Sequence, residues 1–191
     1  FTKAGGPNYN VAASMNLPII NDRLAVRVSG FYNRDGGYID NITLGEKNVG
    51  RADVYGGRVD ALFEATDNLS IRVAAYAQNI RRDGTAQADY AFNRAPIDGE
   101  LNQRRVLREP FDQKFRIVSG TVVYDVGPAT LTSITSYQTN KVSYRQDASP
   151  QYVPLLSLFG IPIGAVGLDF GVDTDKFTQE VRLASSGGGF I

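Results

Sequence analysis

The chain has 191 residues with 20 basic and 20 acidic side chains, and it contains neither cysteine nor histidine. This length predicts one domain or part of one. Balanced charge offers no basic surface for phosphates, so no nucleic-acid partner is expected. The missing residue types exclude a Cys/His zinc site, an imidazole base, a thiol nucleophile and a disulfide framework. A mean hydropathy of −0.21 fits a soluble protein and equally a membrane barrel whose strands alternate in polarity.

The two ends of the chain predict a piece of a longer protein. Residues 1–7 lack the charged, apolar and small-residue succession of a signal peptide. Residues 185–191 have a turn composition followed by two residues that can open another strand.

Alternation with a period of two residues is the main structural signal. Tyr9, Val11 and Met15 alternate with polar residues such as Asn10 and Asn16, which predicts a strand with one apolar face. The same reasoning predicts three hairpins and a seventh strand, and no segment has a convincing helical period. The segments are residues 8–17, 24–33, 55–64, 69–78, 114–126, 129–146 and about 177–183. The faces of 129–146, which is rich in Thr and Ser, stay unassigned.

Strand length and loop asymmetry favour a membrane barrel. The connections alternate between a few residues and the long segments 35–54, 80–113 and 147–175. Strands of about eleven residues, tilted by about 45°, match the apolar band of an outer-membrane barrel. Aromatic residues stand at both ends of the apolar face, as in the two interfacial girdles of such barrels. They are Tyr9, Tyr32 and Tyr55 at the long-loop end, and Phe63 and Tyr124 at the short-turn end.

A soluble antiparallel β-sandwich is the alternative fold, because its strands also alternate. On the membrane interpretation, seven strands are too few to close a barrel, and an open edge in lipid leaves backbone groups unpaired. The predicted fold class is therefore all-β: an antiparallel up-and-down meander of about seven long strands, forming part of a large transmembrane β-barrel.

Several phrases of the sequence resemble the early barrel strands of TonB-dependent outer-membrane receptors. They occur in order, with a hairpin between each expected pair, and cover nearly the whole chain. They are Leu24-Ala-Val-Arg-Val-Ser-Gly-Phe-Tyr32, Tyr55-Gly-Gly-Arg-Val59, Glu109-Pro-Phe-Asp-Gln-Lys-Phe115, Ala129-Thr-Leu-Thr-Ser-Ile-Thr-Ser-Tyr137 and Thr174-Asp-Lys-Phe-Thr-Gln-Glu-Val-Arg-Leu183.

The resemblance implies that residues 1–191 are a partial barrel domain, without the plug and the C-terminal strands of a barrel of about twenty-two strands. It implies a bacterial outer-membrane location and active import of a scarce ligand such as an iron-siderophore. The implied partners are outer-membrane lipid, lipopolysaccharide, the plug of the same protein and the TonB energising complex. The alternatives are a passive porin-like channel and a soluble sandwich that serves as a binding module.

Three arginines in the second long loop are the ligand-site candidates. Arg104, Arg105 and Arg108 form a basic cluster that can meet an anionic chelate or a lipopolysaccharide phosphate. The alternative is neutralisation by their acidic neighbours Glu100, Glu109 and Asp112.

Two other loop features have ordinary explanations. Asp35, Asp40 and Glu46 lack the spacing of a calcium loop and are expected to be solvated carboxylates, so no metal is expected. Residues 151–168 are uncharged, yet two prolines and three glycines argue against a helix. This apolar loop is expected to pack on a plug or other loops, or else to contact ligand.

A set of charged residues points away from the apolar face and predicts a charged lumen wall with a structural role. No Ser or Thr has a plausible base partner and no phosphate-binding loop follows a strand, so neither enzyme activity nor a cofactor is expected. The sequence does not identify a transported ligand. The predicted wall residues are Arg27, Arg58, Asp60, Arg72, Glu180 and Arg182.

Overall fold

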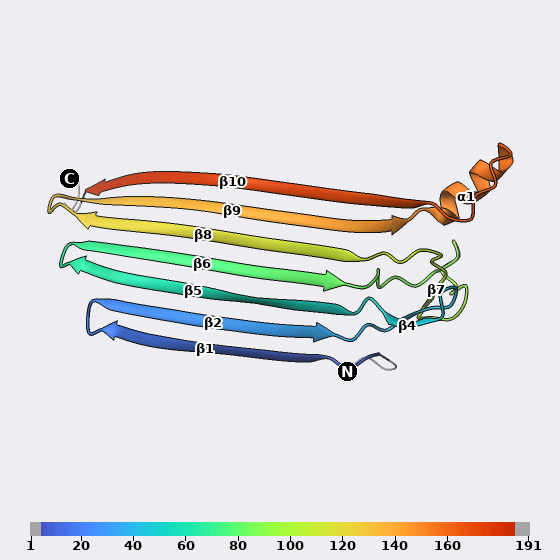
Figure 1. The fold of residues 1–191 in the computed structure, drawn as a ribbon, viewed down its shortest axis with the longest axis horizontal. Helices are drawn as coiled ribbons and strands as arrows, with labels where there is room; N and C mark the ends of the chain where they lie inside the picture. The colour runs from blue at the N-terminus through green and yellow to red at the C-terminus, as the bar shows by residue number, and fades with distance from the viewer. Residues whose placement is uncertain (1–4, 186–191) are drawn as a thin grey trace.

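The computed structural model describes residues 5–185, and seven long strands dominate it (Figure 1). Each strand is antiparallel to its neighbours and the strands follow chain order, which confirms the predicted all-β, up-and-down meander. The predicted further strand beyond residue 185 lies outside the described residues. The strands of the sheet are β1 (Tyr9–Ile20), β2 (Leu24–Asp35), β5 (Ala52–Thr66), β6 (Leu69–Arg82), β8 (Phe111–Asp125), β9 (Ala129–Asp147) and β10 (Gly167–Ser185).

Tight turns join the strands of each hairpin at one end of the sheet. Asp22, between β1 and β2, has a φ of 54°, a conformation that Asp and Asn tolerate better than most residues. Gly127, between β8 and β9, has a φ of 89°, which favours glycine. Its N–H donates to the Asp125 carboxylate at 2.8 Å. These turns are where the sequence predicts them.

A small second sheet lies at the opposite end of the long strands (Figure 1). Strand β3 (Ile39–Asn41) pairs antiparallel with β4 (Glu46–Val49) and parallel with β7 (Asn102–Gln103). The sequence does not predict these strands, because two to four residues are too few to show a period. The pairing joins the first long loop to the second, and it buries Ile39 and Val49.

Strand β10 begins at Gly167, so the expected connection 147–175 is nine residues too long at its C-terminal end. The alternation of polar and apolar residues changes its parity along β10, so the sequence does not reveal the first half of the strand. Near Phe177 the apolar residues have odd numbers, whereas at the start the apolar residues are the even-numbered Phe170 and Val172, and Asp173 and Asp175 are odd.

The third long loop contains a helix, which corrects the expectation that no segment is helical. Helix α1 spans Ser149–Leu158 and carries Pro150 in its first turn, where proline needs no hydrogen-bonded N–H. Pro154 lies inside it, so proline is tolerated here within a short helix. The helix ends before Gly160, whose φ is 74°. None of the helices among residues 5–185 has the length and apolar character needed to cross a membrane.

Candidate functional site

The long sheet has an apolar face whose residues align across all seven strands. One row of directly opposite residues consists of Met15, Val28, Val59, Ala75, Val118, Tyr137 and Phe177. This register assigns the faces of β9, which the sequence leaves open: Tyr137 and Leu131 are on the apolar face. Met15 is 56% exposed and Phe177 66%, so no other part of the described chain covers this row.

The accessible surface of the chain reflects this exposure. It is 13012 Å² for 20.8 kDa. A compact monomer of this mass exposes about 9,000 Å². The only buried apolar side chains of the described residues are Ile39, Val49 and Ala148, all at the long-loop end. Among residues 5–185, therefore, nothing covers the apolar face of the sheet.

The level at which the apolar face begins shifts in steps across the sheet. It is the same on β2 and β5, and again on β8, β9 and β10, and it moves by two residues at each of the other three strand pairs. The row through Tyr9 on β1 reaches β10 at Gly171, but the apolar face of β10 begins at Phe177, six residues nearer the tight turns. The boundary thus shifts by six residues over six strand-to-strand steps. We call the part between this boundary and the tight turns the apolar band. Its first residues are Tyr9, Tyr32, Tyr55, Ala77, Val118, Tyr137 and Phe177.

Three tyrosines line this boundary on the first three strands. The ring centroids of Tyr9 and Tyr32 are 5.6 Å apart and those of Tyr32 and Tyr55 are 6.5 Å apart, and both pairs are stacked. The Tyr32 hydroxyl donates to the carboxylate of Asp53, which also lies 3.7 Å from the Arg34 guanidinium. The tyrosine rings lie on the side of the apolar band, and the charges of Asp53 and Arg34 lie directly beyond it. The polarity of this face therefore changes sharply at the boundary.

The opposite face, which we call the charged face, has an ion-pair network near its centre. Asp60 Oδ2 accepts from Arg58 Nη2 at 2.7 Å, and Arg72 binds both carboxylate oxygens at 2.5 and 2.7 Å. Arg27 lies directly opposite Asp60 on β2. Glu180 and Arg182 pair on the same face of β10. The register thus puts all six predicted wall residues on one face.

The three candidate arginines lie in one loop but bind different acids. Arg105 lies 3.0 Å from Asp89 and 3.4 Å from Glu109, whereas Arg104 pairs with Asp98 and Arg108 with Glu46. Glu109 is one of the neighbours expected to neutralise them. The Arg105 side chain is only 17% exposed, but those of Arg104 and Arg108 are 58% and 73% exposed. Two of the three arginines are therefore accessible to a ligand.

The candidate acidic residues of the first loop do not converge. The Asp40 carboxylate accepts the N–H of Asn48 at 3.1 Å, and Glu46 pairs with Arg108. Within residues 5–185, no group of three His, Cys, Asp or Glu side chains has the arrangement needed to hold a metal ion.

Asp147, at the end of β9, anchors the second loop, a role the sequence does not reveal. Its carboxylate accepts the N–H groups of Val106 at 2.7 Å, Leu107 at 3.2 Å and Ser149 at 2.9 Å. Burial raises the pKa of Asp147, but these hydrogen bonds outweigh burial and hold the pKa below its ordinary value. The Asp-x-Ser spacing, typical of an Asx turn, is the one local signal in the sequence.

Helix α1 and the residues after it keep much of their apolar surface exposed. Leu155 is 47%, Leu158 83% and Phe159 74% exposed. Within the described part of the chain, these side chains do not pack closely on the other loops. The expected packing on a plug, and the alternative of contact with a ligand, both stay predictions.

Searches of protein-family models, of curated proteins and of solved structures find no match to this chain.

Proposed function

We propose that this chain is part of the wall of a large transmembrane β-barrel in a bacterial outer membrane. In this arrangement the apolar face contacts lipid and the charged face lines the interior. The carrying observation is the oblique boundary of the apolar band. The boundary shifts on average by one residue, about 3.3 Å, for each strand spacing of about 4.8 Å, so its mean slope is about 35°. Strands of outer-membrane barrels tilt by about 35–45°, so a flat membrane surface crosses them at this slope.

The height of the band supports the same proposal. On β5 it runs from Tyr55 to Phe63. These eight residue steps measure about 26 Å along the strand. At a tilt of about 35°, the height along the membrane normal is about 22 Å, close to the ~25 Å apolar band of these barrels. A soluble sandwich has no flat external boundary and requires no such slope.

We further propose that the complete protein is an active importer of the TonB-dependent receptor type, with a scarce ligand such as an iron-siderophore as cargo. The family resemblance supports this, and the ion-paired charged face suits an interior filled by a plug. The long loops, which are tied together at one end, suit the external surface. Arg104 and Arg108 are accessible there to an anionic chelate. A passive porin-like channel is the second candidate, since it also has a polar interior.

Spin labels test the membrane proposal, and the absence of cysteine from the chain simplifies their placement. Single cysteines replace Val28, Ser29, Arg58 and Val59 in the complete protein, reconstituted in lipid. Labels at Val28 and Val59 should collide with dissolved oxygen, and labels at Ser29 and Arg58 with a water-soluble nickel complex. A sandwich would instead protect the valine positions from both reagents.

Transport distinguishes the importer from the porin. Cells that produce the complete protein should take up ferric siderophore under iron limitation, and a protonophore should abolish the uptake. Uptake that persists without the proton gradient would favour the passive channel.

A further inference from the structure

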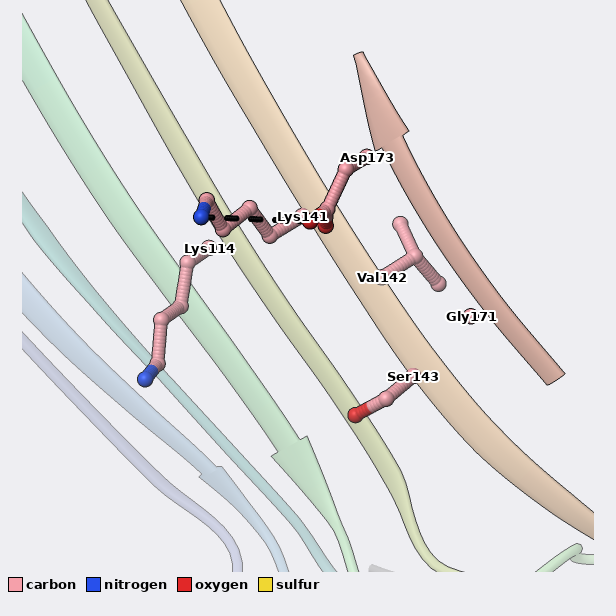
Figure 2. A pocket seen from close by; sticks show the side chains of 6 residues that line it. All are labelled: Lys114, Lys141, Val142, Ser143, Gly171 and Asp173. Atoms are coloured by element: carbon pink, nitrogen blue, oxygen red, sulfur yellow. Dashed lines mark ion pairs between the residues drawn. The ribbon is translucent and has the colours of Figure 1, made fainter. Parts of the chain in front are cut away.

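Two lysines face each other on the apolar face, outside the apolar band. Lys114 on β8 and Lys141 on β9 are directly opposite in the register. Like charges in this position repel each other and destabilise the strand pair. Figure 2 shows both side chains extending away from β10. A negative charge between or above the two ammonium groups would relieve this repulsion and stabilise the pair.

The chain supplies part of that charge. Asp173 and Asp175 on β10 lie on the same face, in the rows of Lys141 and Arg116, so the three cations of β8 and β9 exceed these two acids by one charge. Lys114 has no ion-pair partner among residues 5–185, and the single partner of Lys141 there is Asp173 at 3.9 Å. The acid nearest along β8, Asp112, pairs with Arg81 at 3.5 Å.

Arg116 adds a third cation on the same face. It lies two residues from Lys114. Its guanidinium donates to the carbonyl oxygens of Gln78 and Phe115 and to the side-chain oxygen of Asn79, and none of these three acceptors is charged. We call Lys114, Arg116 and Lys141 the outer basic cluster.

The cluster lies at the depth of lipid headgroups in the proposed orientation. Lys114 and Lys141 each stand four residues beyond the band, which begins at Val118 and Tyr137. Four residues are about 13 Å along a strand, or about 11 Å along the normal at a tilt of about 35°. An open hollow of about 490 Å³ accompanies them (Figure 2). It is lined by Lys114, Lys141, Val142, Ser143, Gly171 and Asp173.

We propose that the outer basic cluster binds a phosphate group of the phosphorylated glycolipid that forms the outer leaflet. Ammonium groups form charge-assisted hydrogen bonds to phosphate, and Ser143 offers a hydroxyl donor in the same hollow. Gly171 has no side chain, and a Cβ there would meet nothing within 4 Å, so the hollow is open to a sugar headgroup. This inference rests on the proposed function, because only a membrane brings such a headgroup to this face.

The test measures lipopolysaccharide bound to the complete protein purified in mild detergent, by native mass spectrometry. The double variant Lys114→Gln/Lys141→Gln should lose about thirtyfold in affinity, about fivefold for each removed charge. The matched control is Lys176→Gln, which removes a lysine from the charged face of β10 and should bind like the parent. Dephosphorylated lipopolysaccharide should bind the parent as weakly as it binds the double variant.

Two results would overturn the inference. One is equal binding of lipopolysaccharide by the parent and the double variant. The other is binding of inorganic phosphate as tight as that of the glycolipid, which would identify a free-anion site. Spin-label accessibility is measured on the same samples. If the labels still alternate between oxygen and nickel accessibility but the lysine substitutions do not change lipopolysaccharide binding, only this inference fails. If the labels of the parent protein do not alternate, the proposed function fails as well.

Discussion

Val28 on β2 and Val59 on β5 are directly opposite each other at the middle of the apolar band, and their side chains are 39% and 45% exposed. In the proposed orientation this pair lies near the bilayer midplane. Val28→Arg should therefore destabilise the barrel by about 2–4 kcal/mol. The measurement is the amount of folded, heat-modifiable protein in the outer membrane, and this amount should decrease strongly in the variant.

Ser29→Arg is the matched control for Val28→Arg. Ser29 points to the opposite face, where it is directly opposite Arg58 and Ser14. An added arginine there enters a polar interior and should be better tolerated. Better tolerance of Val28→Arg than of Ser29→Arg would show that the faces are assigned in reverse.

Asp60 is predicted to matter more than Glu180 for stability. Its carboxylate is 12% exposed and binds two arginines, whereas that of Glu180 is 45% exposed and binds one. Asp60→Asn should leave Arg58 and Arg72 without a countercharge and lower the unfolding free energy by about 1–2 kcal/mol. Glu180→Gln should change it by less than about 1 kcal/mol. Thermal unfolding in detergent measures both, and an equal effect would contradict the burial argument.

Asp147→Ala should release the second long loop without unfolding the sheet. The variant removes the acceptor for the N–H groups of Val106 and Leu107. Hydrogen exchange of these two amides should accelerate, while exchange in β5 and β6 should not change. Asp147→Asn, which keeps one acceptor oxygen, should show an intermediate effect. Unchanged exchange in the alanine variant would contradict the anchoring role.

The same anchor predicts a dependence on pH. The folded-state pKa of Asp147 is lowered, so its stabilisation is present above the unfolded-state value of about 3.9 and is lost as pH falls through the lower folded-state pKa. Protection of the Val106 and Leu107 amides, corrected for intrinsic exchange, should be constant from pH 7 to about pH 5 and decrease below about pH 4. Loss near pH 6 would assign the effect to another group.

The proposed orientation in the outer membrane predicts which residues are reached from outside the cell. Phe92 lies in the second long loop and is fully exposed, whereas Asp67 lies in the tight turn between β5 and β6. A membrane-impermeant maleimide should label Phe92→Cys on intact cells and Asp67→Cys only after the outer membrane is opened. Labelling of Asp67→Cys on intact cells would invert the orientation.

The long strands were predictable because a polarity period of two residues continues over ten residues or more. In β2, for example, Val26 and Val28 alternate with Arg27 and Ser29. The start of β10 and the faces of β9 were not predictable, because the boundary of the apolar band crosses those strands obliquely. Only the register with neighbouring strands, such as Val118 opposite Tyr137, reveals that boundary.

The site was predictable in part. Clusters of charged residues, such as Arg104 and Arg105, are visible along the sequence. The ion-pair partners of these residues are revealed only by the folded structure. Arg108, for example, reaches Glu46, which is 62 residues away. Lys114 and Lys141 are 27 residues apart, so their opposition appears only with the register of β8 and β9. Long-range pairing of this kind leaves no local pattern.

Because the boundary is oblique, a single row of paired residues begins inside the apolar band and ends outside it. The row that contains Val11 on β1 continues through Tyr32 and Tyr55 and ends at Lys141 on β9 and Asp173 on β10. In the proposed orientation, Val11 touches acyl chains while Asp173 lies at the depth of the lipid headgroups, although both belong to the same row of paired residues. On this proposal, the depth of a position in the bilayer, more than the identity of its cross-strand neighbour, determines which side chain that position accepts.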